Sequence, residues 1–187
     1  VHYHVVAMHQ RPLWRNSHPQ ELSDWRPMAD DLDRFLTQEN LPSVIGVGHS
    51  LGANNTLRLA LAKPQRFSAL VLLDPVIFHP WMSIAWKLIM KLGLGMKIHP
   101  LAASTLRRRR SFPDQKSMFE HYRTKPVFER IPDESLRAYV ESVARSAPGG
   151  GVELAYSPEW ETQIYLTGSL SDLALWRELK NLSQPTL

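Results

Sequence analysis

A serine stands between two glycines in the segment Gly48-His49-Ser50-Leu51-Gly52. A serine hydroxyl attacks a carbonyl only when a base takes its proton and the backbone holds it within reach. The G-x-S-x-G spacing is typical of a sharp strand-to-helix turn that lifts the serine above the edge of a sheet. The segment therefore predicts a nucleophile at Ser50, and a glycine-rich turn without chemistry is the alternative.

The elements on either side of this serine fit such a turn. Residues 43–48 are almost wholly apolar and predict a buried strand, and residues 51–63 have a helical pattern that Pro64 stops. Residues 69–73 contain no polar residue and predict a third strand, as expected where helices cover both faces of a sheet. Ser50 is thus expected between a strand and a helix.

The chain before this segment continues the same alternation. Residues 2–8 are rich in β-branched and aromatic residues and predict a buried strand. A helix is expected to begin at Ser23 or Asp24, with Pro27 in its first turn, and to end at Asn40. The order strand, helix, strand, helix, strand predicts an α/β fold with a parallel sheet and flanking helices.

The alternation stops after Asp74. Residues 79–180 show helical patterns and turns without a further convincing pair of buried strands, which predicts a helical insertion. Its most apolar helix is expected either to pack in a core or to act as a lid beside an apolar substrate channel. The apolar positions of that helix are Trp81, Ile84, Trp86, Leu88, Ile89 and Leu92.

The G-H-S-L-G motif, with L-V-L-L-D-P after the next strand, makes the chain resemble cap-bearing members of the α/β-hydrolase superfamily. The resemblance implies a partial α/β-hydrolase fold, the middle segment of that fold. Residues 1–78 would form a core segment like strands four to six, residues 79–180 the helical cap, and residues 181–187 the start of a further core strand. We therefore expect an incomplete protein.

The family order places a third strand between the strands at 2–8 and 43–48. Without it these two strands leave a gap or pair in another order, and each orphaned backbone group costs about 1–3 kcal/mol. Such losses compare with the net stability of a whole domain, roughly 5–15 kcal/mol. We expect these 187 residues alone to fold poorly or to aggregate.

The resemblance also implies roles for individual residues. Ser50 would be the nucleophile, and the backbone N–H of Leu51 would be half of the oxyanion hole, within the motif that also contains Gly48, His49 and Gly52. The second oxyanion donor, the triad acid and the triad histidine would lie outside this chain. His49 lies inside the motif, and its side chain is expected to point away from the serine.

Residues of the chain itself offer a second set of partners. Asp74 follows the strand beside that of Ser50, at the sheet edge where sites form, and His79 comes five residues later. A triad of Ser50, His79 and Asp74 is therefore conceivable, although Asp74-Pro75 also fits a structural turn. His9, with its neighbours Gln10 and Arg11, is expected either to line the pocket or to be solvated.

Charge and composition restrict other functions. The chain has 22 Lys and Arg against 18 Asp and Glu, a net charge of +4, and no cysteine, which excludes thiolate sites and fits a cytoplasmic location. His2 and His4 have no nearby carboxylate, so neither a metal nor a cofactor is expected. The cluster Arg107–Arg110 favours a solvated surface over an anion-binding site, and Glu159 and Glu161 favour a solvated edge over acid/base chemistry.

These observations predict a serine hydrolase that acts on an ester or related acyl bond of a small, apolar substrate. A serine at the elbow disfavours the haloalkane-dehalogenase and epoxide-hydrolase branches, which need aspartate there. Acyl transfer and carbon–carbon bond hydrolysis remain open, as does the oligomeric state. The main alternative is a non-catalytic hydrolase-like protein or inactive fragment. Neither nucleic-acid binding nor stable membrane insertion is expected.

Overall fold

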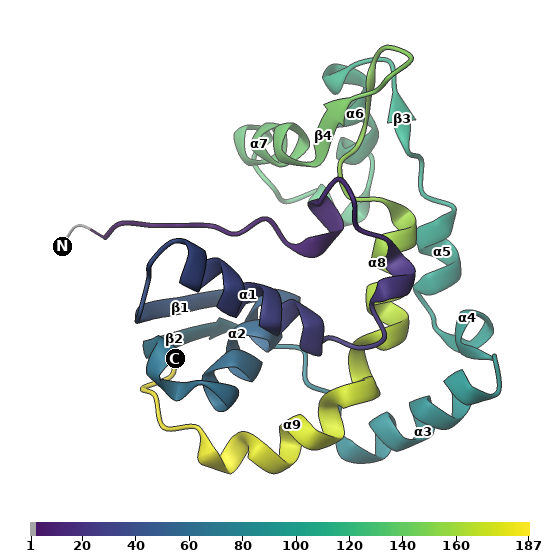
Figure 1. The fold of residues 1–187 in the computed structure, drawn as a ribbon. Helices are drawn as coiled ribbons and strands as arrows, with labels where there is room; N and C mark the ends of the chain where they lie inside the picture. Colours follow the sequence, from purple (N-terminus) through teal and green to yellow (C-terminus); the bar gives the residue numbers. More distant parts are fainter. Residues whose placement is uncertain (1–2) are drawn as a thin grey trace.

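The computed structural model describes residues 3–187, and Figure 1 shows a parallel strand pair with helices beside it and a separate small lobe. The elements are α1 (Arg26–Gln38), β1 (Val44–His49), α2 (Leu51–Ala62), β2 (Phe67–Leu73), α3 (Pro80–Lys91), α4 (Gly95–Ile98), α5 (Ala102–Leu106), β3 (Ser111–Phe112), α6 (Gln115–Arg123), α7 (Asp133–Val143), β4 (Ala144–Ser146), β5 (Val152–Leu154), α8 (Pro158–Thr167) and α9 (Asp172–Glu178). Short 3₁₀ turns connect several of them.

The strands β1 and β2 pair in parallel and form the sheet that carries the serine turn. Both strands and the helix between them lie within one or two residues of the ranges predicted from sequence. The last residues of the chain run beside β2 in the same direction, where the Leu187 N–H donates to the Leu70 carbonyl at 3.0 Å and Thr186 forms a parallel bridge with Leu70. The confirmed fold class is α/β.

The strand predicted at residues 2–8 is wrong for the part of it that the structure describes. Residues 3–8 are exposed or half-buried and belong to no strand, and His2 lies outside the described residues. Figure 1 shows this N-terminal segment running apart from β1. Within residues 3–187, β1 pairs only with β2. A β-branched run becomes a strand only when a second backbone pairs with it, and these residues have none.

The expectation that helices cover both faces of the sheet is also wrong. Gly46 and Gly48 of β1 are buried on the face that α2 covers, whereas Ile45 and Val47 are 46% and 66% exposed on the other. Side chains alternate between the two faces of a strand, so the uninterrupted apolar run gives this sheet one buried face and one apolar, open face.

Helix α1 begins slightly later than predicted. Its first residue is Arg26, and Trp25 occupies the N-cap position without a side-chain cap. Asp24 lies one residue before the N-cap position of the helix. Its carboxylate nevertheless accepts the Arg26 backbone N–H at 2.8 Å. Pro27 lies in the first turn as predicted, and the helix ends before Asn40, which has a positive φ of 54°.

The insertion was expected to be helical, but its small lobe also contains a sheet. It contains an antiparallel sheet of order β3-β5-β4, against which α6 and α7 pack (Figure 1). Strands of two or three residues are too short to show a period in the sequence, which is why they were missed. The buried core of this lobe is Phe112, Met118, Tyr122, Leu136, Val140 and Leu154.

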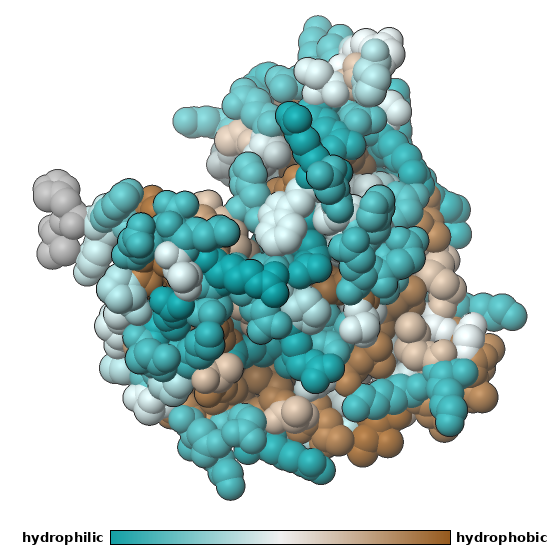
Figure 2. All heavy atoms as spheres, viewed as in Figure 1, coloured by the Kyte–Doolittle hydropathy of each residue, from teal (hydrophilic) through white to brown (hydrophobic). Residues whose placement is uncertain are grey.

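Helix α3 does not pack into a core as its composition suggested. Ser83 is its buried residue, whereas Trp81, Ile84 and Leu88 are all more than half exposed. Figure 2 shows apolar atoms gathered over the position of this helix. Among residues 3–187, no helix is both long enough and apolar enough to cross a bilayer.

Candidate active site

Ser50 occupies a sharp turn between β1 and α2. Its φ of 52° and ψ of −116° lie in a region that residues with a side chain rarely adopt. Two hydrogen bonds hold this backbone: the Ser50 N–H donates to the Leu73 carbonyl of β2 at 2.9 Å, and the Ser50 carbonyl accepts from the Asn54 N–H at 3.1 Å. The chain therefore changes from extended to helical at this one residue.

The two glycines of the motif do different things. A Cβ atom added to Gly48 would lie 2.6 Å from the backbone N of Ala53 and from the carbonyl group of Gly52, so the strand and the helix cross too closely for a side chain. A Cβ atom on Gly52 would meet only the Gln10 Nε2 atom, at 3.7 Å. The close approach thus requires glycine at position 48, whereas the space at position 52 admits a side chain.

The beginning of α2 offers a hydrogen-bond donor beside Ser50. Leu51 is the first residue of the helix, so its backbone N–H has no partner within the helix. The positive end of the helix dipole lies at the same place and favours negative charge there. The side chain of Leu51 packs against the buried cluster of Trp25 and Trp160, which leaves its backbone beside the serine.

The two other predicted triad residues belong to the segment that follows β2. Asp74 directly follows Leu73, whose carbonyl binds Ser50, and it is exposed with a φ of 47°. The His79 Nδ1 accepts the Trp81 N–H at 3.5 Å, and its ring lies edge-on to Trp176 at 5.7 Å. Among residues 3–187, no hydrogen bond joins Ser50 to either side chain, so this triad stays a prediction.

His49 and His9, the two other histidines considered near the motif, are both exposed. His49 is on the exposed face of β1, because Gly48 before it faces inward. His9 is exposed, and its carbonyl accepts the Trp14 Nε1–H at 2.8 Å. Arg11, close to His9 in sequence, donates twice to the Asp31 carboxylate at 2.8 Å and so attaches its loop to α1.

A buried polar network, which sequence reasoning missed, fixes α2 to the loop after β2. The Asn54 amide donates to the Val76 carbonyl at 2.7 Å and accepts the Arg58 Nε–H at 2.6 Å. Arg58 also forms an ion pair with Asp172 of α9, whose second oxygen accepts the Phe78 N–H at 2.8 Å. The network thereby holds the segment that bears Asp74 and His79 against the helix that follows Ser50.

Burial changes the proton affinities of the two charged groups in this network. It raises the pKa of the Asp172 carboxyl, although the Phe78 N–H and the Arg58 guanidinium act in the opposite direction. It also lowers the pKa of Arg58, against the stabilising charge of Asp172. Both side chains are at least nine-tenths buried, so removing one would leave the other as an uncompensated charge.

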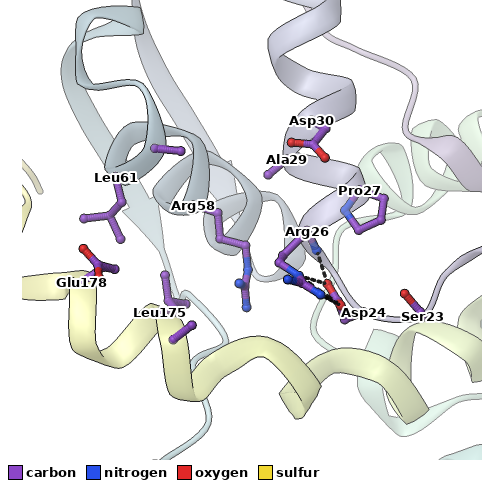
Figure 3. Close-up of a pocket in the computed structure, with 12 residues that line it drawn as sticks. Ser23, Asp24, Arg26, Pro27, Ala29, Asp30, Arg58, Leu61, Leu175 and Glu178 are labelled. Atoms are coloured by element: carbon purple, nitrogen blue, oxygen red, sulfur yellow. Dashed lines mark hydrogen bonds and ion pairs between the residues drawn. The ribbon is translucent and has the colours of Figure 1, made fainter.

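Two pockets lie near these elements, and Ser50 lines neither. The larger, of about 590 Å³, lies between α1, α2 and α9, and Figure 3 shows Arg26 and Arg58 there with the Arg26–Asp24 ion pair. The smaller, of about 350 Å³, lies beside α3. Residues 3–187 contain no group of three His, Asp or Glu side chains that could hold a metal ion.

The acidic and basic residues of the insertion pair with one another. Arg108 binds Glu161, and Arg110 binds Glu159. Glu161 also accepts the Tyr165 hydroxyl at 2.9 Å, and burial raises the pKa of this tyrosine to about 12. The two glutamates therefore join α8 to the arginine segment, and half of the arginine cluster is already paired.

Comparison with known proteins adds a family match over most of the chain. Residues 1–172 match the model of the family described as alpha/beta hydrolase fold. Two curated relatives match shorter stretches. The chain is 34% identical over 88 residues to a tRNA U34 carboxymethyltransferase of Vibrio cholerae, which covers 42% of the chain and 25% of that protein. It is 36% identical over 81 residues to the Abhydrolase domain-containing protein AKT2 of Alternaria alternata, covering 43% and 26%.

Solved structures resemble a larger part of the chain. An E-2-(acetamidomethylene)succinate hydrolase matches with a TM-score of 0.64 and 20% identity, covering 95% of this chain and 59% of that one. The esterase Rv0045c of Mycobacterium tuberculosis has a TM-score of 0.60 at 19% identity, covering 91% and 50%. A thioesterase domain from the curacin biosynthetic pathway has a TM-score of 0.60 at 19% identity, and the match covers 92% of this chain and 57% of that domain. At these identities the likeness concerns the fold, and the chain spans about half the length of these proteins.

Proposed function

Because the chain belongs to the alpha/beta hydrolase fold family, we propose that it is a serine hydrolase that cleaves an ester or related acyl bond, with Ser50 as its nucleophile. The esterase and the thioesterase domain among the similar structures support a carbonyl substrate of this class. The chain spans only part of each of these proteins, so the substrate class rests on the chemistry that Ser50 offers.

The observation that carries the proposal is the backbone at Ser50. A φ of 52° with a ψ of −116° costs of order 1–3 kcal/mol in a residue with a side chain. The hydrogen bonds to Leu73 and Asn54 and the crossing at Gly48 hold the residue in this conformation. A glycine would occupy the turn with less strain, so a serine there is best explained by a use for its hydroxyl.

The geometry supports a short reaction sequence. The Ser50 Oγ attacks the acyl carbonyl carbon while a base takes its proton, and the carbonyl oxygen becomes an oxyanion. The Leu51 N–H donates to that oxyanion, with the end of the α2 dipole behind it. The alcohol or thiol then leaves, and water releases the acyl group from Ser50 by the same steps.

The hydrogen bonds of residues 3–187 do not identify the base that would take the Ser50 proton. The imidazole of His79 lies against Trp176, and its Nδ1 already accepts the Trp81 N–H. We therefore assign the base to a histidine that is not part of this chain, as the family resemblance implied.

Ester hydrolysis tests the proposal directly. The protein that contains this chain together with the proposed base is incubated with p-nitrophenyl acetate, butyrate and octanoate, and we expect turnover that the Ser50→Ala variant loses by at least about 10²-fold. Ser43→Ala is the matched control, because this exposed serine directly precedes β1 and its side chain forms no hydrogen bond within residues 3–187, and it should keep full activity. Equal rates in the wild-type and Ser50→Ala chains would contradict the proposal.

A non-catalytic hydrolase-like protein is the second candidate, and the absence of a histidine hydrogen bond to Ser50 among residues 3–187 favours it. The His79→Ala variant helps to separate the cases. If His79 is the base, this variant loses activity as Ser50→Ala does. If the base lies elsewhere, His79→Ala keeps most of the activity. A chain that hydrolyses none of the esters in any form supports the non-catalytic candidate.

A further inference from the structure

The outer face of α3 is an apolar stripe that no other element of residues 3–187 covers. Trp81, Ile84, Leu88 and Leu92 follow one another at intervals of three or four residues, so they share one face of the helix and its last turn. Their exposed fractions are 63%, 57%, 59% and 62%. The opposite face holds the buried Ser83, so the helix has a packed inner face and an open apolar one.

The charge around this α3 stripe has one sign. No acidic residue occurs between Asp74 and Asp114, whereas Lys87, Lys91 and Lys97 lie on or next to α3. All three lysines are exposed, and none takes part in an ion pair among residues 3–187. By contrast, Arg108 and Arg110 are paired with glutamates of α8. Unpaired positive charge therefore lies beside the apolar stripe, on these three lysines.

The 350 Å³ cavity beside α3 is continuous with the stripe. Trp81, Met82 and Ile98 are exposed residues that also line this cavity. Its other walls include Trp86, whose Nε1–H donates to the Leu166 carbonyl at 2.7 Å, and His99, whose Nδ1 accepts the Leu101 N–H at 3.3 Å. Because these polar groups already have partners, the cavity suits an aliphatic chain better than a polar ligand.

We propose that α3 docks on the surface of an anionic lipid bilayer. The stripe would enter the boundary between headgroups and acyl chains, and the three lysines would lie among the lipid phosphates. A helix with an apolar face and flanking lysines binds membranes in this way, lying in the interface without crossing it. Aromatic residues such as Trp81 favour this boundary because an apolar ring carries a polar N–H. The cavity gives one lipid chain a place beside the helix.

Vesicle flotation tests this docking in the full chain, because aggregates sink while vesicle-bound protein rises. We expect flotation with vesicles of phosphatidylcholine and phosphatidylglycerol at low salt, and at least about tenfold less with phosphatidylcholine alone. Raising the salt to about 0.5 M should reduce flotation, since it screens the lysines. Equal flotation with both vesicle types, or none with either, would overturn the proposal.

Matched variants separate the apolar contribution from the charged one. Leu88→Glu should abolish flotation, and Lys87→Glu with Lys91→Glu should reduce it by at least about tenfold, since each lysine near an anionic surface contributes about fivefold. The control is Lys116→Glu with Lys125→Glu, which makes the same change of charge on the exposed surface of the small lobe and should float as the wild type does. Equal losses in both double variants would overturn the assignment to α3.

A probe on the stripe keeps the test valid if Leu88→Glu misfolds. The chain has no cysteine, so Leu92→Cys and Val127→Cys each accept one environment-sensitive fluorophore. Anionic vesicles should shift the emission of the probe at position 92 to shorter wavelength and leave that at position 127, in the small lobe, unchanged. Val127 is the control because it is also strongly exposed. A stripe covered instead by a second copy of the chain would show a shift on concentration without vesicles, which would contradict the proposal.

Discussion

The backbone of Ser50 couples stability to the proposed function. A positive φ with an extended negative ψ is available to glycine and strained for serine, so the hydroxyl is held in place at the expense of folding free energy. The Cβ atom of Ser50 is what makes this backbone conformation strained. The crossing of β1 and α2, which Gly48 permits, imposes the conformation.

We therefore expect Ser50→Gly to stabilise the chain although it removes the nucleophile. The expected gain is about 1 kcal/mol relative to Ser50→Ala, because alanine keeps the strained Cβ while glycine adopts this conformation freely. Thermal unfolding of the two variants under the same conditions measures this difference. A lower melting temperature for Ser50→Gly than for Ser50→Ala would show that the turn is not strained.

Residue-level prediction from sequence succeeded where the signal is local. The turn at Ser50 could be predicted because a strand, a motif and a helix follow one another within about twenty residues. The difference between Gly48 and Gly52 could not, because it depends on the angle at which strand and helix cross. The partners of Arg11 and Arg58 were also out of reach, since their carboxylates are 20 and 114 residues away in the chain.

At the level of elements, the buried ion pair of Arg58 and Asp172 connects α2 to α9. It also holds the Phe78 N–H and, through Asn54, the loop after β2. This loop leads from the strand beside Ser50 to α3. Loss of the pair should therefore loosen the elements around the proposed site as well as the whole fold.

Breaking one side of this pair should cost more than replacing both sides. We expect Asp172→Leu to destabilise the chain by about 3–5 kcal/mol, because Arg58 would remain buried without a counter-charge. The double variant Arg58→Met with Asp172→Leu should recover a large part of that loss. Chemical or thermal unfolding of the single and double variants measures the coupling. If the double variant loses as much as the sum of both single variants, the two side chains do not act as a pair.

Sequence patterns located the long elements better than they assigned their surroundings. The apolar composition of α3 suggested a core helix, but composition does not tell which neighbour covers a helix, and here the outer face has none among residues 3–187. The β3-β5-β4 sheet was missed for another reason, since its strands have two or three residues each. The first outcome depends on contacts between distant segments, and the second on the shortness of the strands.

For the whole molecule, the most consequential feature is the uncovered side of the parallel sheet. Ile45 and Val47 lie exposed on one face of β1, and its second edge has no partner strand within residues 3–187. An exposed apolar strand with a free edge is a site for association with other chains. This agrees in direction with the expectation that these 187 residues alone aggregate.

Charge on this face should reduce the association. We expect Val47→Lys to lower the light scattering of the purified chain at a given concentration several-fold, because a lysine on an edge strand opposes pairing with a second edge. Lys is also expected to leave the fold intact there, since the Val47 side chain is mostly exposed. Val127→Lys, at a similarly exposed position in the small lobe, is the control. Equal scattering by both variants would place the association elsewhere.

The central claim is that Ser50 is an activated nucleophile, and covalent labelling tests it most directly. The protein that contains this chain together with the proposed base is treated with a fluorophosphonate, and the modified residue is located by mass spectrometry of its peptides. We predict a single phosphonate on Ser50, formed within minutes and absent from Ser50→Ala, while Ser43→Ala labels as the wild type does. An unlabelled chain, or one modified equally at several exposed serines, would contradict the claim.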